Sequence, residues 1–184
     1  LRAHMAYEES RHATSNTNQA ALRELNETRA ELEKLAPQAE NSVEYWTFRA
    51  MYTPPTLGAS ELIAKASELC DTWAYSMSRQ GRIFEANQAL NQASVAYERA
   101  IALQPEWLPP LLRRLLVAGK QAKWAKALTF LSMVLDVSPR EPVAKAFIRR
   151  YLQNLEEVGA DHPATQGIGK KHPNWRELGS STGQ

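Results

Sequence analysis

The sequence predicts an all-α protein built from antiparallel helical hairpins, and three observations lead to this prediction. Alanine and leucine occur 27 and 21 times, against 7 valines and 5 isoleucines. This ratio favours helices, because β-branched side chains lose rotamer freedom there. Prolines, which are disfavoured inside helices, divide the sequence into helix-length stretches. The gaps between these stretches are very short, so neighbouring helices must run antiparallel as hairpins.

Length and composition limit the organisation of the chain. Its 184 residues correspond to one domain, or to one small domain with appendages. The single cysteine, Cys70, excludes an internal disulfide. No stretch of 18 or more apolar residues occurs, so we expect membrane association only through an anchor that this chain does not contain.

The N-terminal part predicts a helix that is separate from the hairpins. Residues 1–5 have the character of a cloning-vector remnant, and residues 6–36 form the expected helix. Three leucines follow a near-heptad spacing that Arg29 interrupts: Leu22, Leu25 and Leu32. One interpretation is a solvated helix that packs a leucine stripe on the main body. The other is a coiled coil through which the chain self-associates.

Residues 37–158 are expected to form the helical domain, and residues 159–184 an irregular tail in which Trp175 is the one large apolar anchor. Within the domain, residues 43–52 predict a short helix with a buried aromatic face. The proline and glycine positions then predict five consecutive helices, at 60–80, 82–104, 109–121, 122–137 and 142–158.

A repeated spacing is the strongest feature of the sequence. Small and large apolar residues and a proline follow one spacing twice, as Ala93, Tyr97, Ala100 and Pro105, then as Ala127, Leu131, Val134 and Pro139. This pattern resembles the second helix and terminal proline of a tetratricopeptide repeat, and its period equals that of the family, about 34 residues. Trp124 matches the aromatic residue that follows the turn between the two helices of a repeat. The resemblance covers residues 67–152 with two degenerate repeats, and a third is expected at 142–155.

The first repeat admits two registers. If Gly81 forms the turn before the second helix, the small and aromatic positions fall on Ala86, Leu90 and Ala93, with Ala74 as the small residue of the first helix. The two registers differ by about two helical turns. We therefore expect a second helix two turns longer than the family norm. In either register, the alanines allow close approach of crossing helices.

The resemblance implies a fold and a mode of binding. Tetratricopeptide-like hairpins stack into a short solenoid, and the first helix of each repeat lines a concave groove that binds a peptide or another protein. The implied groove positions are Glu68, Thr72, Ser76 and Arg79, then Leu112, Leu116 and Lys120, then Ala146, Arg150 and Gln153. The cations Arg79, Lys120 and Arg150 would suit an acidic or carboxylate-bearing ligand.

The sequence gives no indication of enzyme activity. The spacings of histidine and cysteine match no metal-binding motif, and no nucleophile has a candidate base nearby, so we expect no cofactor and no enzyme activity. Residues 105–152 carry nine Lys and Arg against three acids, whereas residues 6–104 have a balance of −4. This basic region is either a set of solvated helix faces or a surface for an acidic partner. Nucleic acid is the weakest candidate partner, because no aromatic residues interleave with the cations.

Three functions remain open from the sequence. The first is a protein-interaction scaffold, such as the periplasmic domain of an anchored protein in bacterial envelope assembly, secretion or polysaccharide export. The second is a regulatory subunit of an enzyme complex. A cytoplasmic location is the alternative to the bacterial cell envelope. The third is a dimerisation protein that associates through the helix at 6–36.

Overall fold

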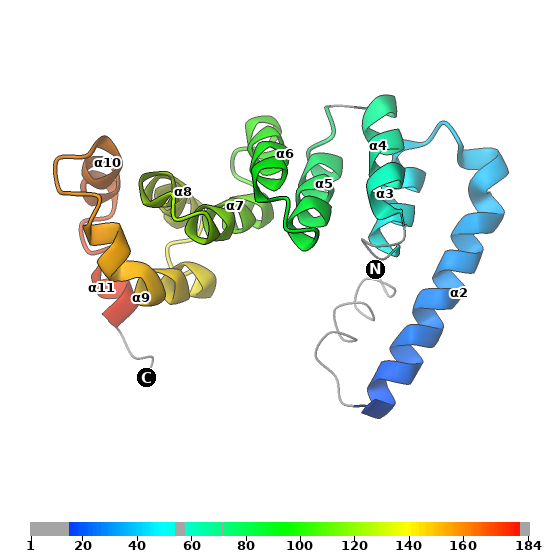
Figure 1. Cartoon of the computed structure of the whole chain (residues 1–184), viewed down its shortest axis with the longest axis horizontal. Helices are drawn as coiled ribbons and strands as arrows, with labels where there is room; N and C mark the ends of the chain where they lie inside the picture. Colours follow the sequence, from blue (N-terminus) through cyan, green and yellow to red (C-terminus); the bar gives the residue numbers. More distant parts are fainter. Residues whose placement is uncertain (1–14, 54–57, 71, 181–184) are drawn as a thin grey trace. The chain divides into compact units, whose positions relative to one another are not determined.

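The computed structural model describes residues 15–53, 58–70 and 72–180, and all regular secondary structure in these ranges is helical (Figure 1). Residues 1–14, which include the 1–5 segment, lie outside the described residues. The chain divides into two compact units, residues 1–71 and 72–184. The prediction of an all-α fold of helical hairpins is confirmed. The helices are α2 (Ser15–Ala39), α3 (Val43–Met51), α4 (Ala59–Leu69), α5 (Ala74–Ala86), α6 (Leu90–Leu103), α7 (Leu108–Lys120), α8 (Trp124–Val137), α9 (Pro142–Glu156), α10 (Pro163–Lys171) and α11 (Glu177–Ser180).

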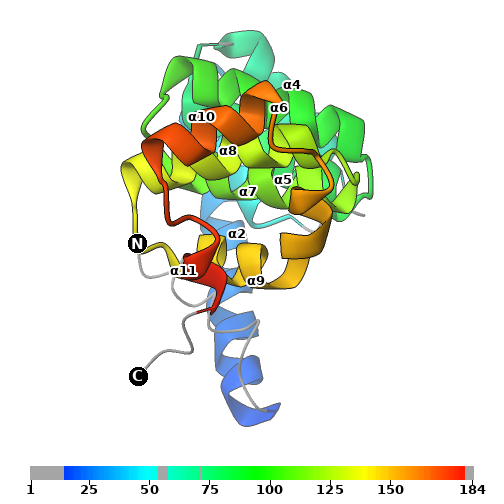
Figure 2. The same ribbon diagram turned by 90° about the vertical axis from the view of Figure 1, so that its left-hand side faces the viewer.

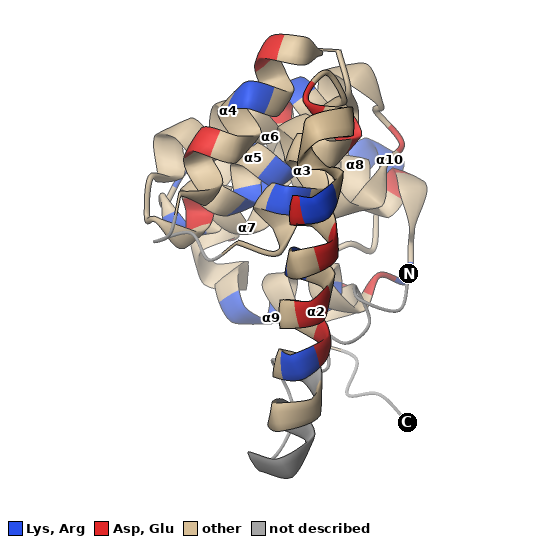
Figure 3. Cartoon of the chain, turned by 90° about the vertical axis from the view of Figure 1, so that its right-hand side faces the viewer, with Lys and Arg blue, Asp and Glu red and all other residues tan. Residues whose placement is uncertain are grey.

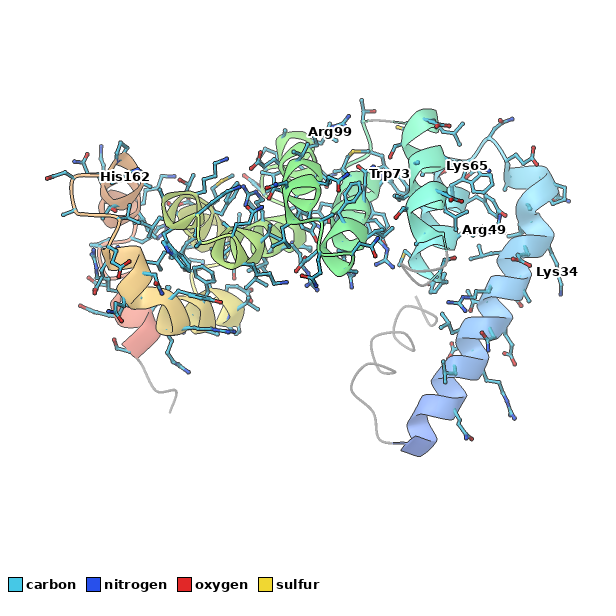
Figure 4. All side chains as sticks on the ribbon, viewed as in Figure 1. Lys34, Arg49, Lys65, Trp73, Arg99 and His162 are labelled. Carbon is cyan, nitrogen blue, oxygen red and sulfur yellow. The ribbon has the colours of Figure 1, made fainter. Side chains whose placement is uncertain are left out.

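The first unit contains one hairpin, α3 and α4. Ser42 caps α3, because its side-chain oxygen accepts a hydrogen bond from the backbone N–H of Tyr45. Trp46 is buried, and its Nε1 donates to the backbone oxygen of Glu40 at 2.8 Å. Two cations lie over the Trp46 ring, Arg49 of α3 at 5.7 Å and Lys65 of α4 at 4.5 Å. Figure 4 labels the side chains of Arg49 and Lys65. The aromatic segment therefore contributes to the core of this unit.

Helix α2 contacts α3 but leaves much of its apolar side exposed. Both acidic and basic residues lie along it (Figure 3). Its link to α3 includes an ion pair between Glu33 and Arg49 at 3.4 Å. Leu22 and Leu35 are each 49% exposed, which is high for large aliphatic side chains. The leucines of α2 are therefore only partly buried by the other helices of the first unit.

The second unit consists of hairpins that follow one another along the chain. Helices α5 and α6 form one hairpin and α7 and α8 the next, and α6 packs against α7 (Figure 1). The predicted helices 60–80 and 82–104 are wrong. Helix α4 ends at Leu69 before α5 begins at Ala74, and α5 ends at Ala86 before α6 begins at Leu90. The turn between α5 and α6 uses Gln88 at φ 60°, and Ala122, one repeat period later, has φ 53° in the turn between α7 and α8. Non-glycine residues rarely adopt this left-handed conformation, so neither turn shows the usual glycine signal.

Gly81 lies inside α5 and does not form a turn. A Cβ atom at this position would lie 2.6 Å from the ring of Tyr97 in α6. Glycine is needed here because the Tyr97 ring packs directly on the α5 backbone. The register based on Ala93, Tyr97 and Ala100 is therefore the one that describes the hairpin. The expected two-turn extension of the second helix is wrong.

The repeat period extends beyond the two repeats found in the sequence. One buried position is alanine in three successive hairpins, and a second is a large apolar residue in the same three. A third position is buried in four helices, the last of them α10, which packs on α8. These sets are Ala59, Ala93 and Ala127; Ile63, Tyr97 and Leu131; and Ala66, Ala100, Val134 and Ile168. The same crossing geometry thus recurs along the chain.

The C-terminal segment is not irregular as expected. Helix α10 packs on α8, and the short helix α11 packs on α9 (Figure 2). Trp175 is completely buried in the same core as Leu135 and Ile148, which explains why this segment is ordered. Asp136 of α8 accepts a hydrogen bond from Lys171 at 2.8 Å and contacts His172 at 3.1 Å.

The Asp136 contacts respond to pH. The hydrogen bond from Lys171 lowers the pKa of Asp136 and outweighs the opposing effect of desolvation. A carboxyl with a lowered pKa stabilises the folded state above its unfolded pKa, and this contribution disappears as acid protonates it. The link between α8 and the end of α10 is therefore weakened by acid.

Candidate functional site

The candidate site is a surface formed by the first helices of successive hairpins, α5, α7 and α9. Leu112, Leu116 and Lys120 follow one side of α7 at intervals of four residues. The repeat period places the equivalent side of α5 at Ser78, Arg82 and Ala86, and that of α9 at Ala146, Arg150 and Asn154. Helix α7 contacts both α5 and α9. We call these nine positions the first-helix face.

Five of the ten predicted groove residues occupy these positions, and Gln153 lies next to Asn154. Leu112 and Leu116 are partly exposed and rest on the core, whereas Arg150 and Gln153 are exposed. Arg79 does not belong to this face: it is buried, and it is equivalent to Phe147, which packs against Gly119 of α7. A position that faces a neighbouring helix in one hairpin is a poor candidate for ligand contact in another. Arg82, further along α5, occupies the position that the sequence assigned to Arg79.

Lys120 forms an ion pair within the protein. Its Nζ atom lies 2.6 Å from Oε1 of Glu85 on α5, and the buried Glu85 also accepts a hydrogen bond at 3.0 Å from the hydroxyl of Tyr97. Burial, assisted by the Glu85 charge, raises the pKa of Tyr97, so the hydroxyl remains a donor. This cluster joins α5, α6 and α7. Lys120 thus acts first as the counterion of a buried carboxylate.

A second buried cation is also paired. Arg114 of α7 is 1% exposed, and its Nε and Nη2 donate to Oε1 of Glu98 on α6 at 2.9 and 2.7 Å. Its guanidinium also lies 4.7 Å from the ring centre of Phe130. Both acids, Glu85 and Glu98, precede the basic 105–152 region in the sequence. The stacking of hairpins therefore neutralises part of the local positive charge, which the sequence alone does not reveal.

Aromatic side chains gather where α5 and α7 begin. Tyr75 of α5 stacks on Trp107 at 6.0 Å with 29° between the rings, and Trp73 lies 5.4 Å from Tyr75. All three are partly exposed. A hollow of about 380 Å³ beside Trp107 is lined by Gln104, Pro105 and Glu106. Sequence analysis did not find this cluster, although Trp73 and Trp107 are one repeat period apart and both precede a first helix.

The opposite part of the face is basic and flat. The guanidinium of Arg150 lies 5.2 Å from the ring centre of Tyr151, which is packed against Trp124 and Phe147. Arg150 is exposed, and a guanidinium has five N–H donors with which it can bind a carboxylate. This arrangement is suited to recognition and offers no nucleophile.

Within the described residues, no three His, Cys, Asp or Glu side chains gather as a metal site would require. No described helix combines the length and the apolar character needed to cross a bilayer.

Comparison with known proteins identifies similar folds but no family. No family model matches the chain, and no curated protein sequence matches it. Among solved structures, a crystal structure of MamA protein superposes with a TM-score of 0.66 at 15% identity, covering 95% of this chain and 94% of that one. A second crystal structure of MamA gives 0.63 at 18% identity, with coverage of 92% and 96%.

A further MamA structure leads to the same conclusion. MamA 41-end from Desulfovibrio magneticus RS-1 superposes with a TM-score of 0.62 at 16% identity and covers 99% of this chain and 97% of that chain. At these identities the likeness concerns the fold. The chain has a tetratricopeptide-like helical repeat fold, similar to that of the all-helical protein MamA.

Proposed function

We propose that this chain is a non-catalytic protein-interaction module whose first-helix face binds a partner segment with acidic and apolar side chains. One observation carries the proposal. Arg82 of α5 and Arg150 of α9 occupy the same repeat position on either side of α7, which presents the partly exposed Leu112 and Leu116 between them. Two arginines around an aliphatic centre suit a segment that offers carboxylates and one or two apolar anchors.

The fold supports this proposal in a second way. Each first helix packs one side on the core. On the other side, α7 and α9 leave partly or fully exposed residues and α5 contributes the partly exposed Arg82, so neighbouring hairpins create an extended surface. Such surfaces bind peptides through side-chain contacts spread over several helices. A role in bacterial envelope assembly, secretion or polysaccharide export stays a prediction, as does regulation of an enzyme complex.

The test is peptide selection followed by charge reversal. A displayed library of random peptides is selected on the immobilised chain, and enriched peptides are measured by fluorescence anisotropy. We expect acidic peptides with apolar anchors, whose Kd rises about tenfold or more in Arg82→Glu/Arg150→Glu, because each lost charged hydrogen bond weakens binding by about 1.5–3 kcal/mol. Lys123→Glu/Lys126→Glu is the matched control, since both lysines are exposed at the start of the second helix of their hairpin.

Two results would contradict the proposal. One is a library that yields no enriched peptide. The other is enriched peptides that bind the wild type, the arginine variant and the lysine variant with equal affinity.

Self-association through α2 is the second candidate function, and the exposed leucines favour it. Leu22 and Leu35 are each 49% exposed, and around α2 they lie on either side of Leu25 and Leu32. We expect Leu22→Glu/Leu35→Glu to shift sedimentation of the chain from dimer to monomer, because charges in such a seam oppose helix pairing. Ala30→Glu/Gln38→Glu adds the same charge elsewhere on α2 and should leave the dimer intact. A wild-type chain that sediments as a monomer would exclude this function.

A further inference from the structure

The first-helix face has two chemically different rows. At the start of the helices lie Tyr75, Pro109 and Val143, one repeat apart, and we call them the apolar row. About two turns further along each helix lie Arg82, Leu116 and Arg150, which we call the arginine row. Direct contacts fix α5 beside α7 at both ends: Tyr75 stacks on Trp107 near the apolar row, and Glu85 meets Lys120 beyond the arginine row.

The distance between the rows matches one helix. Two turns of an α-helix rise about 10 Å, and an α-helix with its side chains is about 10–12 Å wide. Between the rows lie the buried Ser78, the partly exposed Leu112 and the exposed Ala146, of which only Leu112 is a large side chain. A helix laid across α5, α7 and α9 would therefore touch one row with each edge.

Charge sets the orientation of such a helix. Glu106 lies beside Trp107 near the apolar row, and Glu141 caps the start of α9, where its Oε1 accepts from the backbone N–H of Val143 at 3.2 Å. These carboxylates repel an acidic edge from the apolar row, while Arg82 and Arg150 attract it at the other row. A guanidinium has five N–H donors, so an arginine that takes part in one contact still has donors for a ligand carboxylate.

We infer that the partner segment binds as an amphipathic helix lying across α5, α7 and α9, with its apolar edge on the apolar row and its acidic edge on the arginine row. This inference rests on the proposed function and specifies the conformation and direction of the ligand. The hollow of about 380 Å³ beside Trp107 adds room for a large side chain from the apolar edge. Helices recognised in this way present anchors three and four residues apart.

Three synthetic peptide probes, each long enough for about five helical turns, test the inference. The first is an alanine-based helix with leucines along one edge and glutamates along the opposite edge. The second has the same composition in scrambled order, and the third carries two central prolines that prevent a helix. We expect the first probe to bind the full chain at least tenfold more tightly than the other two, as measured by fluorescence anisotropy.

Photo-crosslinking tests the direction. A benzophenone side chain on the leucine edge should label tryptic peptides that contain Tyr75 or Val143, and one on the glutamate edge should label those around Arg82 or Arg150. Labels mixed between the rows, or equal affinity for all three probes, would overturn the inference. If library-selected peptides then still depend on Arg82 and Arg150, the proposed function stands without it. If those peptides also fail to bind, both fail.

Discussion

Replacing Trp175 with alanine is expected to lower the free energy of unfolding by about 3–5 kcal/mol, the usual range for a large aromatic residue in a core. Trp175 is completely buried among the side chains that join α8 and α9 to the C-terminal segment. Its indole N–H has no hydrogen-bond partner, so the loss comes from packing and from the contact of the ring with the Arg176 guanidinium, 4.5 Å from the ring centre. Urea unfolding followed by circular dichroism measures the effect.

Trp107→Ala is the matched control for this substitution. Trp107 is partly exposed and stacks on Tyr75, so its removal leaves less of a cavity and should destabilise the chain far less. A Trp175→Ala variant that unfolds at the same urea concentration as the wild type would contradict the prediction. It would mean that residues 172–180 do not belong to the cooperative core.

Glu98→Gln is expected to lower the free energy of unfolding by about 3 kcal/mol, because it leaves the Arg114 charge buried without a counterion. This value is at the lower end of the usual range, since the Glu98 side chain is 43% exposed and Phe130 also contacts the guanidinium. Thermal and urea unfolding of the purified variant provide the measurement.

A second substitution tests whether the loss in Glu98→Gln comes from the unpaired charge of Arg114. Arg114→Met preserves most of the buried hydrocarbon and removes the charge that needs a partner, so it should destabilise the chain by less than about 1.5 kcal/mol. Adding Glu98→Gln to Arg114→Met should then have little further effect. Additive losses in the double variant would show that the two side chains act independently.

Much of the fold could be predicted because the crossing positions keep small or apolar residues. Ala93, Ala100 and Ala127 lie where helix backbones approach one another, and all three are fully buried. The helix ends were harder to predict, since Gln88 and Ala122 occupy turn positions where glycine is the usual signal. Gly81 was then misread as a turn, although its role is to accept the Tyr97 ring.

The last repeat was missed for a related reason. Asp161, just before α10, and Thr165 within α10 stand where the earlier repeats have alanine and a large apolar residue. Only Pro173, one period after Pro139, and the buried Ile168 preserve the pattern. A search for the proline period alone would have extended the repeat region to α10.

Some residues of the candidate site could be predicted, but the ion pairs around it could not. Leu112, Leu116 and Arg150 follow from the period once α7 and α9 are placed. The sequence places Arg82 in the second helix of its repeat, because the first helix is expected to end at residue 80, whereas α5 extends to Ala86. The pairing of Lys120 with Glu85 joins side chains from successive hairpins, and only the packing of those hairpins brings them together.

At two glycines an aromatic ring packs directly on the helix backbone, and this limits which substitutions these positions can accept during evolution. Gly81 receives Tyr97 from the other helix of its own hairpin, and Gly119 receives Phe147 from the following hairpin. A larger residue at either glycine is tolerated only if the matching ring becomes smaller. Positions 81 and 97, and likewise 119 and 147, are therefore expected to vary as linked pairs among related chains, the first within one repeat and the second between two.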